Sequence, residues 1–201
     1  MYRYILIFLL SILSFSSFAQ TLDTIYIMDP SFEDISDDVE TNYWADCGNQ
    51  KEHPFPIFNN GDKQFKVTEK SFEGDFFIGL VVRENGTTEG CSQYLNQPLT
   101  AGKIYQFSVL LRAPRVFNNQ NIDFAHPIVL EVYGCADACT TDELLAFTDP
   151  VTEQEWMQFD FILEPTDDYN WLTLHAGYLD NKAPYNGSVL IDYVSDIIEI
   201  E

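Results

Sequence analysis

Apolar and polar residues alternate with a period of two along several short segments of this chain. The clearest segment is 104–112, where the large apolar side chains occupy the odd-numbered positions. Residues 157–163 and 172–176 repeat the pattern, and clusters of Gly, Pro, Asn and Asp separate such segments. A period of two is typical of β-strands with one face in a core. The pattern therefore predicts an all-β protein, built as a β-sandwich of two antiparallel sheets.

The same pattern sets the expected strands. They cover residues 76–83, 91–95, 104–112, 128–133, 156–164, 171–176 and 189–194. One helix of at most one or two turns is predicted at Thr140–Phe147, which has a threonine cap and an acidic first turn. The intervening segments 34–60, 113–127 and 179–188 are long and contain aromatic, Pro and Asn residues. Loops of this length in a compact domain are either functional or disordered, and their aromatic residues favour order.

The first 19 residues have the pattern of an export signal. Arg3 is basic, residues 4–13 are apolar, and Ser17-Phe18-Ala19 ends in the small residue that signal peptidases cut after. The apolar run is too short to span a bilayer. We therefore expect residues 20–201 to form one exported domain that does not insert into a membrane, and that is secreted, periplasmic or held at the cell surface.

Charge excludes one class of partner. The chain has 10 Lys and Arg against 32 Asp and Glu, a net charge of −22. Phosphate backbones and anionic lipids are repelled by such a chain, so no nucleic-acid partner is expected. An acidic surface does suit hard cations such as calcium.

Four cysteines follow the export signal: Cys47, Cys91, Cys135 and Cys139. An even number in an exported chain predicts two disulfides, with three possible pairings. We favour Cys135–Cys139 and Cys47–Cys91, because the first pair is close enough for one loop to join. A zinc site is disfavoured, since the spacing is not that of paired Cys-x-x-Cys knuckles.

Two end motifs and a longer pattern resemble a known fold family. Residues 29–33 (Asp-Pro-Ser-Phe-Glu) and 191–194 (Ile-Asp-Tyr-Val) resemble the opening and closing strands of galactose-binding-like jelly-roll carbohydrate-binding modules. A longer pattern is similar to an exported Bacteroidetes domain, seen alone or with OmpA-type and gliding-motility proteins. It runs through residues 44–48, 77–83, 86–89, 92–95, 98–102, 105–108 and 184–187. The resemblance implies a jelly roll whose first and last strands are neighbours.

The resemblance also implies a structural calcium ion that ties the opening segment to the closing strand. Glu33 and Asp192 match the positions of its carboxylate ligands, and Asp75 precedes a strand that would lie nearby. Calcium takes six to eight oxygen ligands, so two or three carboxylates with backbone carbonyls would suffice. The alternative is that these are solvent-facing charges at strand ends.

A sugar-binding surface requires rings for stacking and polar groups for hydroxyls. The sequence offers Trp44, Tyr133, Trp171, Tyr178 and Tyr185 as rings, with Arg83, Arg112, Glu131 and His175 as polar partners. Arg112, Glu131 and His175 fall on the strand face opposite the apolar residues, where a groove would place them. Trp44 has an alternative role, because a Trp beside a cysteine often packs a disulfide in the core.

Three functions fit these observations. The first is a non-catalytic, exported module that binds a glycan or another cell-envelope component. The second is a structural or adhesion domain that contacts a protein partner at the cell surface. The third is a small glycan-active enzyme, which is disfavoured because the chain lacks a Gly-x-Ser-x-Gly or His-Glu-x-x-His motif and has no distinctive carboxylate pair.

Overall fold

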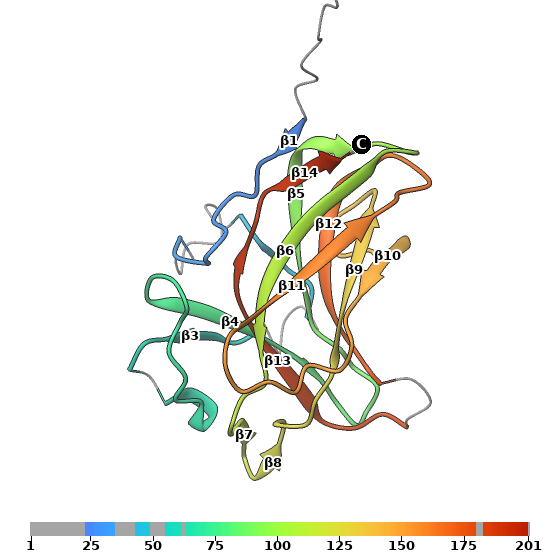
Figure 1. The fold of residues 1–201 in the computed structure, drawn as a ribbon. Helices are drawn as coiled ribbons and strands as arrows, with labels where there is room; N and C mark the ends of the chain where they lie inside the picture. Colours follow the sequence, from blue (N-terminus) through green and yellow to red (C-terminus); the bar gives the residue numbers. More distant parts are fainter. Residues whose placement is uncertain (1–22, 35–42, 49–54, 62, 180–182, 201) are drawn as a thin grey trace, which may run out of the picture.

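The protein is an antiparallel β-sandwich in a computed structural model that describes residues 23–34, 43–48, 55–61, 63–179 and 183–200 (Figure 1). The predicted export signal lies outside these residues. The first half of the chain contains β1 (Thr24–Ile25), β2 (Ala45–Asp46), β3 (Ile57–Asn59), the 3-10 turn η1 (Gln64–Lys66), β4 (Phe76–Val82), β5 (Gly90–Leu99) and β6 (Ile104–Arg112). The second half contains β7 (Asn118–Asn119), β8 (Ile122–Asp123), β9 (Val129–Cys135), β10 (Glu143–Phe147), β11 (Met157–Leu163), β12 (Tyr169–Gly177), β13 (Gly187–Val194) and β14 (Ile197–Ile200).

Two sheets face each other. The larger has seven strands in the order β1-β14-β6-β13-β4-β3, with β11 on the other side of β6. The smaller has five strands in the order β10-β9-β12-β5-β2. A separate two-stranded hairpin, β7–β8, projects at the lower end in Figure 1. The all-β sandwich predicted from the alternation is thus confirmed.

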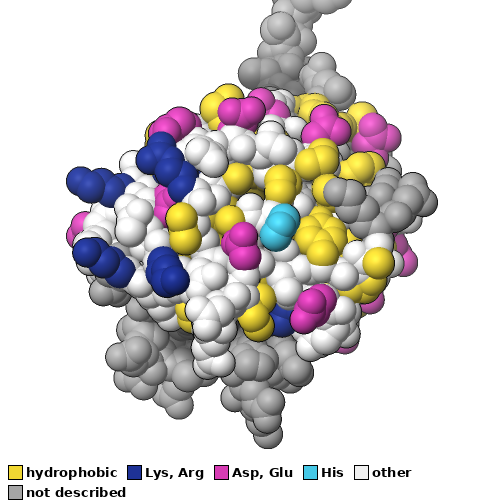
Figure 2. Space-filling view, turned by 90° about the horizontal axis from the view of Figure 1, so that it is seen from below, with side chains coloured by type: hydrophobic (Ala, Val, Ile, Leu, Met, Phe, Trp, Pro, Cys, Tyr) yellow, Lys and Arg dark blue, Asp and Glu magenta, His cyan; other side chains and the backbone are white. Residues whose placement is uncertain are grey.

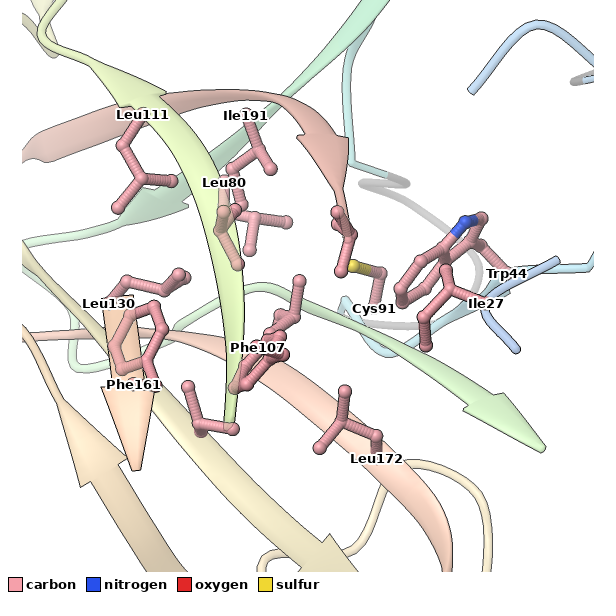
Figure 3. Close-up of a cluster of buried hydrophobic side chains, with 14 of the residues drawn as sticks. Ile27, Trp44, Leu80, Cys91, Phe107, Leu111, Leu130, Phe161, Leu172 and Ile191 are labelled. Atoms are coloured by element: carbon pink, nitrogen blue, oxygen red, sulfur yellow. The ribbon is translucent and has the colours of Figure 1, made fainter. Parts of the chain in front are cut away.

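The core lies between the inner faces of the two sheets. Phe107 and Leu111 of the larger sheet face Leu130 and Leu172 of the smaller one in Figure 3. All four are at most 2% exposed. The alternation predicted for 104–112 and 172–176 has therefore placed its apolar face inward.

A second apolar cluster covers the outer face of the larger sheet. Its buried members are Phe58, Val67, Phe77, Val81, Phe117, Phe124 and Leu190. Phe77 and Val81 alternate along β4 with Ile78 and Leu80, which belong to the main core. Strand β4 is therefore buried on both faces, which explains its nearly continuous apolar sequence.

The two ends of the domain meet as expected. The Val194 backbone N–H donates to the Pro30 carbonyl at 2.8 Å, and β1 pairs with β14. One expected element is wrong: Thr140–Phe147 is no helix, because residues 143–147 pair with β9 as edge strand β10. Pairing with a sheet overrode the local helix signal.

The predicted disulfide pairings are also wrong. Cys47 is bonded to Cys139, with a Cα–Cα distance of 5.0 Å, while Cys91 and Cys135 are buried free thiols. Strand alternation is the reason. Cys91 points into the core beside Trp44 (Figure 3), away from Cys47 at the sheet edge. A disulfide is typical of proteins outside the cytoplasm. Among the described residues, no helix is long and apolar enough to cross a membrane.

Candidate ligand-binding sites

An aromatic hollow lies on the outer face of the five-stranded sheet. We use this name for the cavity of about 390 Å³ lined by Met28, Tyr43, Ala45, Gln93, Tyr94, Asn96 and Trp171. Trp171 and Tyr94 are cross-strand partners whose ring centroids lie 5.4 Å apart. Tyr94 is 58% exposed and Tyr43 is 43% exposed. Such exposed rings are free to stack on an apolar ligand face.

Hydrogen bonds hold this hollow in shape. The buried Gln93 amide accepts from the Met28 N–H at 2.8 Å and donates to the Met28 carbonyl at 2.7 Å. Asn96 accepts from the Tyr26 N–H at 3.0 Å. These bonds fix the opening segment against β5, so the rim is built before a ligand arrives. A site that is pre-ordered loses less conformational entropy on binding.

A second cavity, the end pocket, opens at the end of the sandwich that carries the β7–β8 hairpin. It has a volume of about 440 Å³. Its apolar wall comprises Pro56, Phe65, Val81, Phe117, Ile122 and Phe124, and its polar residues are Gln64, Arg83, Glu84, Asn85, Glu89, Asn119, Gln120 and Asn186. Five of these polar groups are amides, which both donate and accept hydrogen bonds as sugar hydroxyls do.

An ion pair lies on the wall of the end pocket. The Arg83 guanidinium donates to Glu89, and the second carboxylate oxygen of Glu89 accepts from the Val81 N–H at 3.2 Å. Burial raises the pKa of Glu89 to about 7, against the lowering effect of Arg83. The other terminal nitrogen of Arg83, Nη1, is buried without a hydrogen-bond partner. An unsatisfied donor of this kind is costly to bury.

The two loops around the end pocket have strained backbones. Phe65 and Lys66 have φ of 51° and 64°, and Gln120 and Asn121 have φ of 49° and 70°. Positive φ at both central residues is the geometry of a tight hairpin turn, which usually contains Asn or Gly. An aromatic residue such as Phe65 in this region costs of order 1–3 kcal/mol. Strain of this kind is typical of functional loops.

A hydrogen-bonded polar cluster occupies the outer face of the smaller sheet, four residues along β12 from Trp171. Glu131 accepts from the Tyr133 hydroxyl at 3.0 Å and lies 3.1 Å from Nδ1 of His175, whose Nε2 lies 2.8 Å from the Thr88 hydroxyl. The His175 contact lowers the pKa of Glu131. Burial, with the Glu131 contact, raises the pKa of Tyr133 to about 12.

The loop that carries Cys139 separates this cluster from the aromatic hollow. Thr173 lies between His175 and Trp171 on the same strand face, yet it is only 1% exposed. Its hydroxyl donates to Ser92 and contacts the Cys135 thiol, which in turn donates to the Thr140 carbonyl. The predicted groove through Glu131 and His175 is therefore not continuous with Trp171.

The remaining predicted ring and guanidinium residues are dispersed. Trp44 is 1% exposed, packs on Phe32 and donates its indole N–H to the Asp29 carbonyl, so its ring is closed to a ligand. Arg112 lies on the larger sheet under Trp156, apart from Glu131. Tyr178 and Tyr185 contact each other at 5.7 Å beside the end pocket. The Tyr178 hydroxyl donates to the Arg83 carbonyl.

The carboxylates matched to a calcium site meet at one loop. Glu33 accepts from the N–H groups of Asp75 and Phe76 at 2.9 and 2.8 Å. Asp192 is fully buried and accepts from the Phe72 and Glu73 N–H groups at 2.5 and 3.2 Å. Burial raises the pKa of Asp192 to about 7, with a further contribution from Glu33.

These acids fit the chemistry of calcium in part. A third carboxylate oxygen, Oδ2 of Asp29, is buried without a hydrogen-bond partner and interacts electrostatically with Glu33. Hard oxygens with no cationic partner are what calcium prefers. Asp75, however, contacts Glu33 by donating its backbone N–H to the Glu33 carboxylate. Within the described ranges, no three acidic, His or Cys side chains are arranged around a common metal position.

Sequence reasoning missed most of both cavities. Tyr43, Tyr94 and Asn96 were not predicted, and neither was Phe117 or Gln120. One usable signal was present for the end pocket, because Asn residues are frequent in the long segment 113–127. No local signal marked Tyr94, which is 58% exposed.

Comparison with known proteins establishes the fold. No protein-family profile and no curated protein sequence matches the chain. A cyclase from Fischerella sp. TAU is similar in structure, with a TM-score of 0.58 and 15% identity over 90% of this chain and 98% of that one. The CBM22-1 xylan-binding domain of Paenibacillus barcinonensis Xyn10C has a TM-score of 0.50 and 14% identity, covering 91% and 98%.

A third similar structure belongs to a much larger protein. An arabinose-bound GH51 α-L-arabinofuranosidase has a TM-score of 0.59 and 14% identity, and the match covers 89% of this chain but 27% of that one. At these identities the likeness concerns the fold alone. The chain thus has a jelly-roll sandwich fold that is also found in a carbohydrate-binding module, in a cyclase and in part of a glycoside hydrolase.

Proposed function

We propose that the protein is an exported, non-catalytic glycan-binding module that engages a cell-envelope or environmental polysaccharide through the aromatic hollow. The observation that carries this proposal is the pair of exposed rings of Tyr43 and Tyr94, which surround one cavity with the half-buried ring of Trp171. Large exposed rings in one hollow are expensive to keep in water unless a partner covers them. Tyr and Trp present an apolar face together with a polar edge, which suits a sugar ring.

The known proteins with this fold supply the first probes. The xylan-binding domain and the arabinose-bound enzyme suggest neutral pentose polymers as test ligands. We expect xylohexaose or an arabino-oligosaccharide to bind the purified domain with a weak affinity, because few rings contribute and the Gln93 and Asn96 amides already hydrogen-bond to the backbone. Isothermal titration calorimetry measures this directly.

A matched pair of variants locates the site. Trp171→Ala is expected to reduce binding by roughly 10- to 100-fold, as loss of a central aromatic contact does. Phe147→Ala removes another aromatic ring, which is 64% exposed on the edge strand of the same sheet, outside the hollow. It should leave affinity within about twofold. Equal loss in both variants, or none in Trp171→Ala, would contradict the proposal.

Calcium is proposed as a structural ion at Glu33 and Asp192. Its role would be to neutralise two carboxylates that hold the opening segment, the 71–76 loop and β13 together. An ion that binds only the folded protein stabilises it by about 2.7 kcal/mol at a hundredfold excess over its dissociation constant. Calcium should raise the melting temperature of wild type, and sodium at matched ionic strength should not. Asp192→Ala should abolish most of the response.

The rival function, a small glycan-active enzyme, has one observation in its favour. Glu84 and Glu89 both line the end pocket, and a carboxyl group with a pKa of about 7 is suited to general acid catalysis. Glu89, however, is bound by Arg83 and by the Val81 N–H. Release of reducing sugar from xylan or arabinan, lost in Glu89→Gln, would establish this rival.

A further inference from the structure

The positive charges of this protein are strongly segregated. Of its ten Lys and Arg residues, Arg3, Lys51 and Lys182 lie outside the described ranges, which leaves seven. Lys103 lies at the start of β6 and pairs with Glu199 at 2.7 Å. The other six belong to the outer side of the larger sheet and its loops: Lys63, Lys66, Lys70, Arg83, Arg112 and Arg115. Among the described residues, six of the seven cations therefore lie on one side of the molecule.

Four of those six form an exposed basic rim, which we define as Lys63, Lys66, Lys70 and Arg115. Lys and Arg side chains gather on one side of this end of the molecule in Figure 2. The buried Glu69 holds the rim together. One of its carboxylate oxygens accepts from the Thr68 N–H and the other from the Arg115 N–H at 2.8 Å. Arg115 also pairs with the exposed Glu155.

The basic rim adjoins the end pocket directly. Lys63 and Lys66 flank Gln64 and Phe65, which line the pocket. The Lys66 ammonium lies 3.4 Å from Oδ1 of Asn118, at the base of the opposite hairpin wall. Inside the pocket, Nη1 of Arg83 is a buried donor without a partner. Lys63 and Lys66 thus lie beside the segment that lines the pocket, although they are not part of its lining.

We propose that the end pocket and the basic rim bind an acidic saccharide, whose ring enters the pocket and whose carboxylate or sulfate group meets Lys63 and Lys66. The amides of Asn119, Gln120 and Asn186 match the hydroxyls of the ring, and Phe65 offers an apolar surface for its face. Glu84 on another part of the wall repels a second acid group and so sets the orientation. This site is separate from the aromatic hollow and does not depend on it.

Titration with oligogalacturonides at two salt concentrations tests the proposal. We expect binding at 50 mM NaCl that weakens at 200 mM, because exposed charges are screened. Lys66→Glu should weaken it by roughly tenfold or more, as expected for reversing one charge near the acid group. Lys103→Glu makes the same change of net charge at a distant site, and should stay within about twofold of wild type.

Two further measurements assign the ligand class and separate this site from the proposed function. Asn119→Ala should weaken oligogalacturonide binding, whereas Trp171→Ala should not. The proposal is overturned if neither oligogalacturonides nor sulfated oligosaccharides bind. It is also overturned if Lys66→Glu and Lys103→Glu lose affinity equally. Poly-glutamate binding as tightly as the saccharides would also overturn it, since the rim would then be a general polyanion surface. If Lys66→Glu binds xylohexaose as tightly as wild type does, the aromatic hollow remains supported even when oligogalacturonides fail to bind.

Discussion

The outer faces of the two sheets differ in how far loops cover them. The larger sheet is covered by loops that bring Val67, Phe117 and Phe124 over the outward side chains of β3, β4 and β13, and this cover also builds part of the wall of the end pocket. In the described part of the chain, the outer side of the smaller sheet carries the loop of the Cys47–Cys139 bridge and the opening segment, and Tyr94 stays largely exposed. A cavity bounded by packed loops depends on their stability, whereas a cavity on a bare sheet depends on the strands alone.

The largest difference should appear when a ring is removed from each face. Phe117 is 3% exposed and contacts Phe58, Phe65 and Phe124. Phe117→Ala is therefore expected to lower the free energy of unfolding by about 3–5 kcal/mol, as buried Phe-to-Ala changes do. Phe147→Ala, on the bare side, should change it by less than about 0.5 kcal/mol. Urea denaturation measures both, and similar values would break the comparison.

The disulfide provides the next test, on the smaller sheet. It joins residues 92 positions apart and holds a loop across β12. The double variant Cys47→Ala/Cys139→Ala should lose about 2–4 kcal/mol of stability. It should also expose Thr173 and so join the polar cluster to the aromatic hollow. Cys135→Ala keeps the bridge and is the control. Peptide mapping without reductant that recovers any pairing other than Cys47–Cys139 would refute the assignment.

Buried carboxyls on the larger sheet predict how stability depends on pH. The pKa values of Glu89 and Asp192 are raised to about 7, above their ordinary values of 4.5 and 3.8. The folded protein therefore binds protons more tightly than the unfolded chain. The contribution of these two groups to stability should be fully present below about pH 4 and be lost as pH rises through about 7, with a slope approaching 2.7 kcal/mol per pH unit, roughly 1.36 for each group.

Adding calcium should change this pH dependence. An ion at Asp192 would favour the ionised carboxylate, so the contribution of Asp192 should vanish and the slope should fall by about half. Denaturation from pH 5 to 8, with chelator and with calcium, gives both slopes. Glu89→Gln removes the other contribution and serves as the control. Stability that rises with pH in chelator would contradict the burial argument.

The smallest expected effect concerns the polar cluster. His175→Ala removes contacts to Glu131 and Thr88, each a partly exposed hydrogen bond, and should cost about 1 kcal/mol. His175 and Trp171 are about 13 Å apart along β12, at about 3.3 Å per residue, and the bridged loop lies between them. Xylohexaose binding should therefore stay within about twofold of wild type. A larger loss would mean that cluster and hollow act as one site.

Much of the fold followed from the sequence. The period of two in 104–112 and 172–176 gave both the strands and their inner faces, because burial on one side selects alternate residues. The end motifs placed the opening segment beside the last strand. The sequence could not show that residues 143–147 pair with β9. A Thr cap followed by acidic residues is a local helix signal, whereas pairing with β9 depends on contacts that a local pattern does not reveal.

The candidate sites were determined mainly by tertiary structure. Trp171 was correctly placed on an outward face, but its companions Tyr43 and Tyr94 come from other strands and carried no pattern. Cys47 was paired wrongly because sequence distance does not show which strand face a cysteine occupies. The sequence by itself determined strand periodicity, charge and the meeting of the ends, all of which depend on near neighbours or totals. Only the packing of loops over one sheet decided which rings remain in water, because exposure depends on what lies above a residue in space.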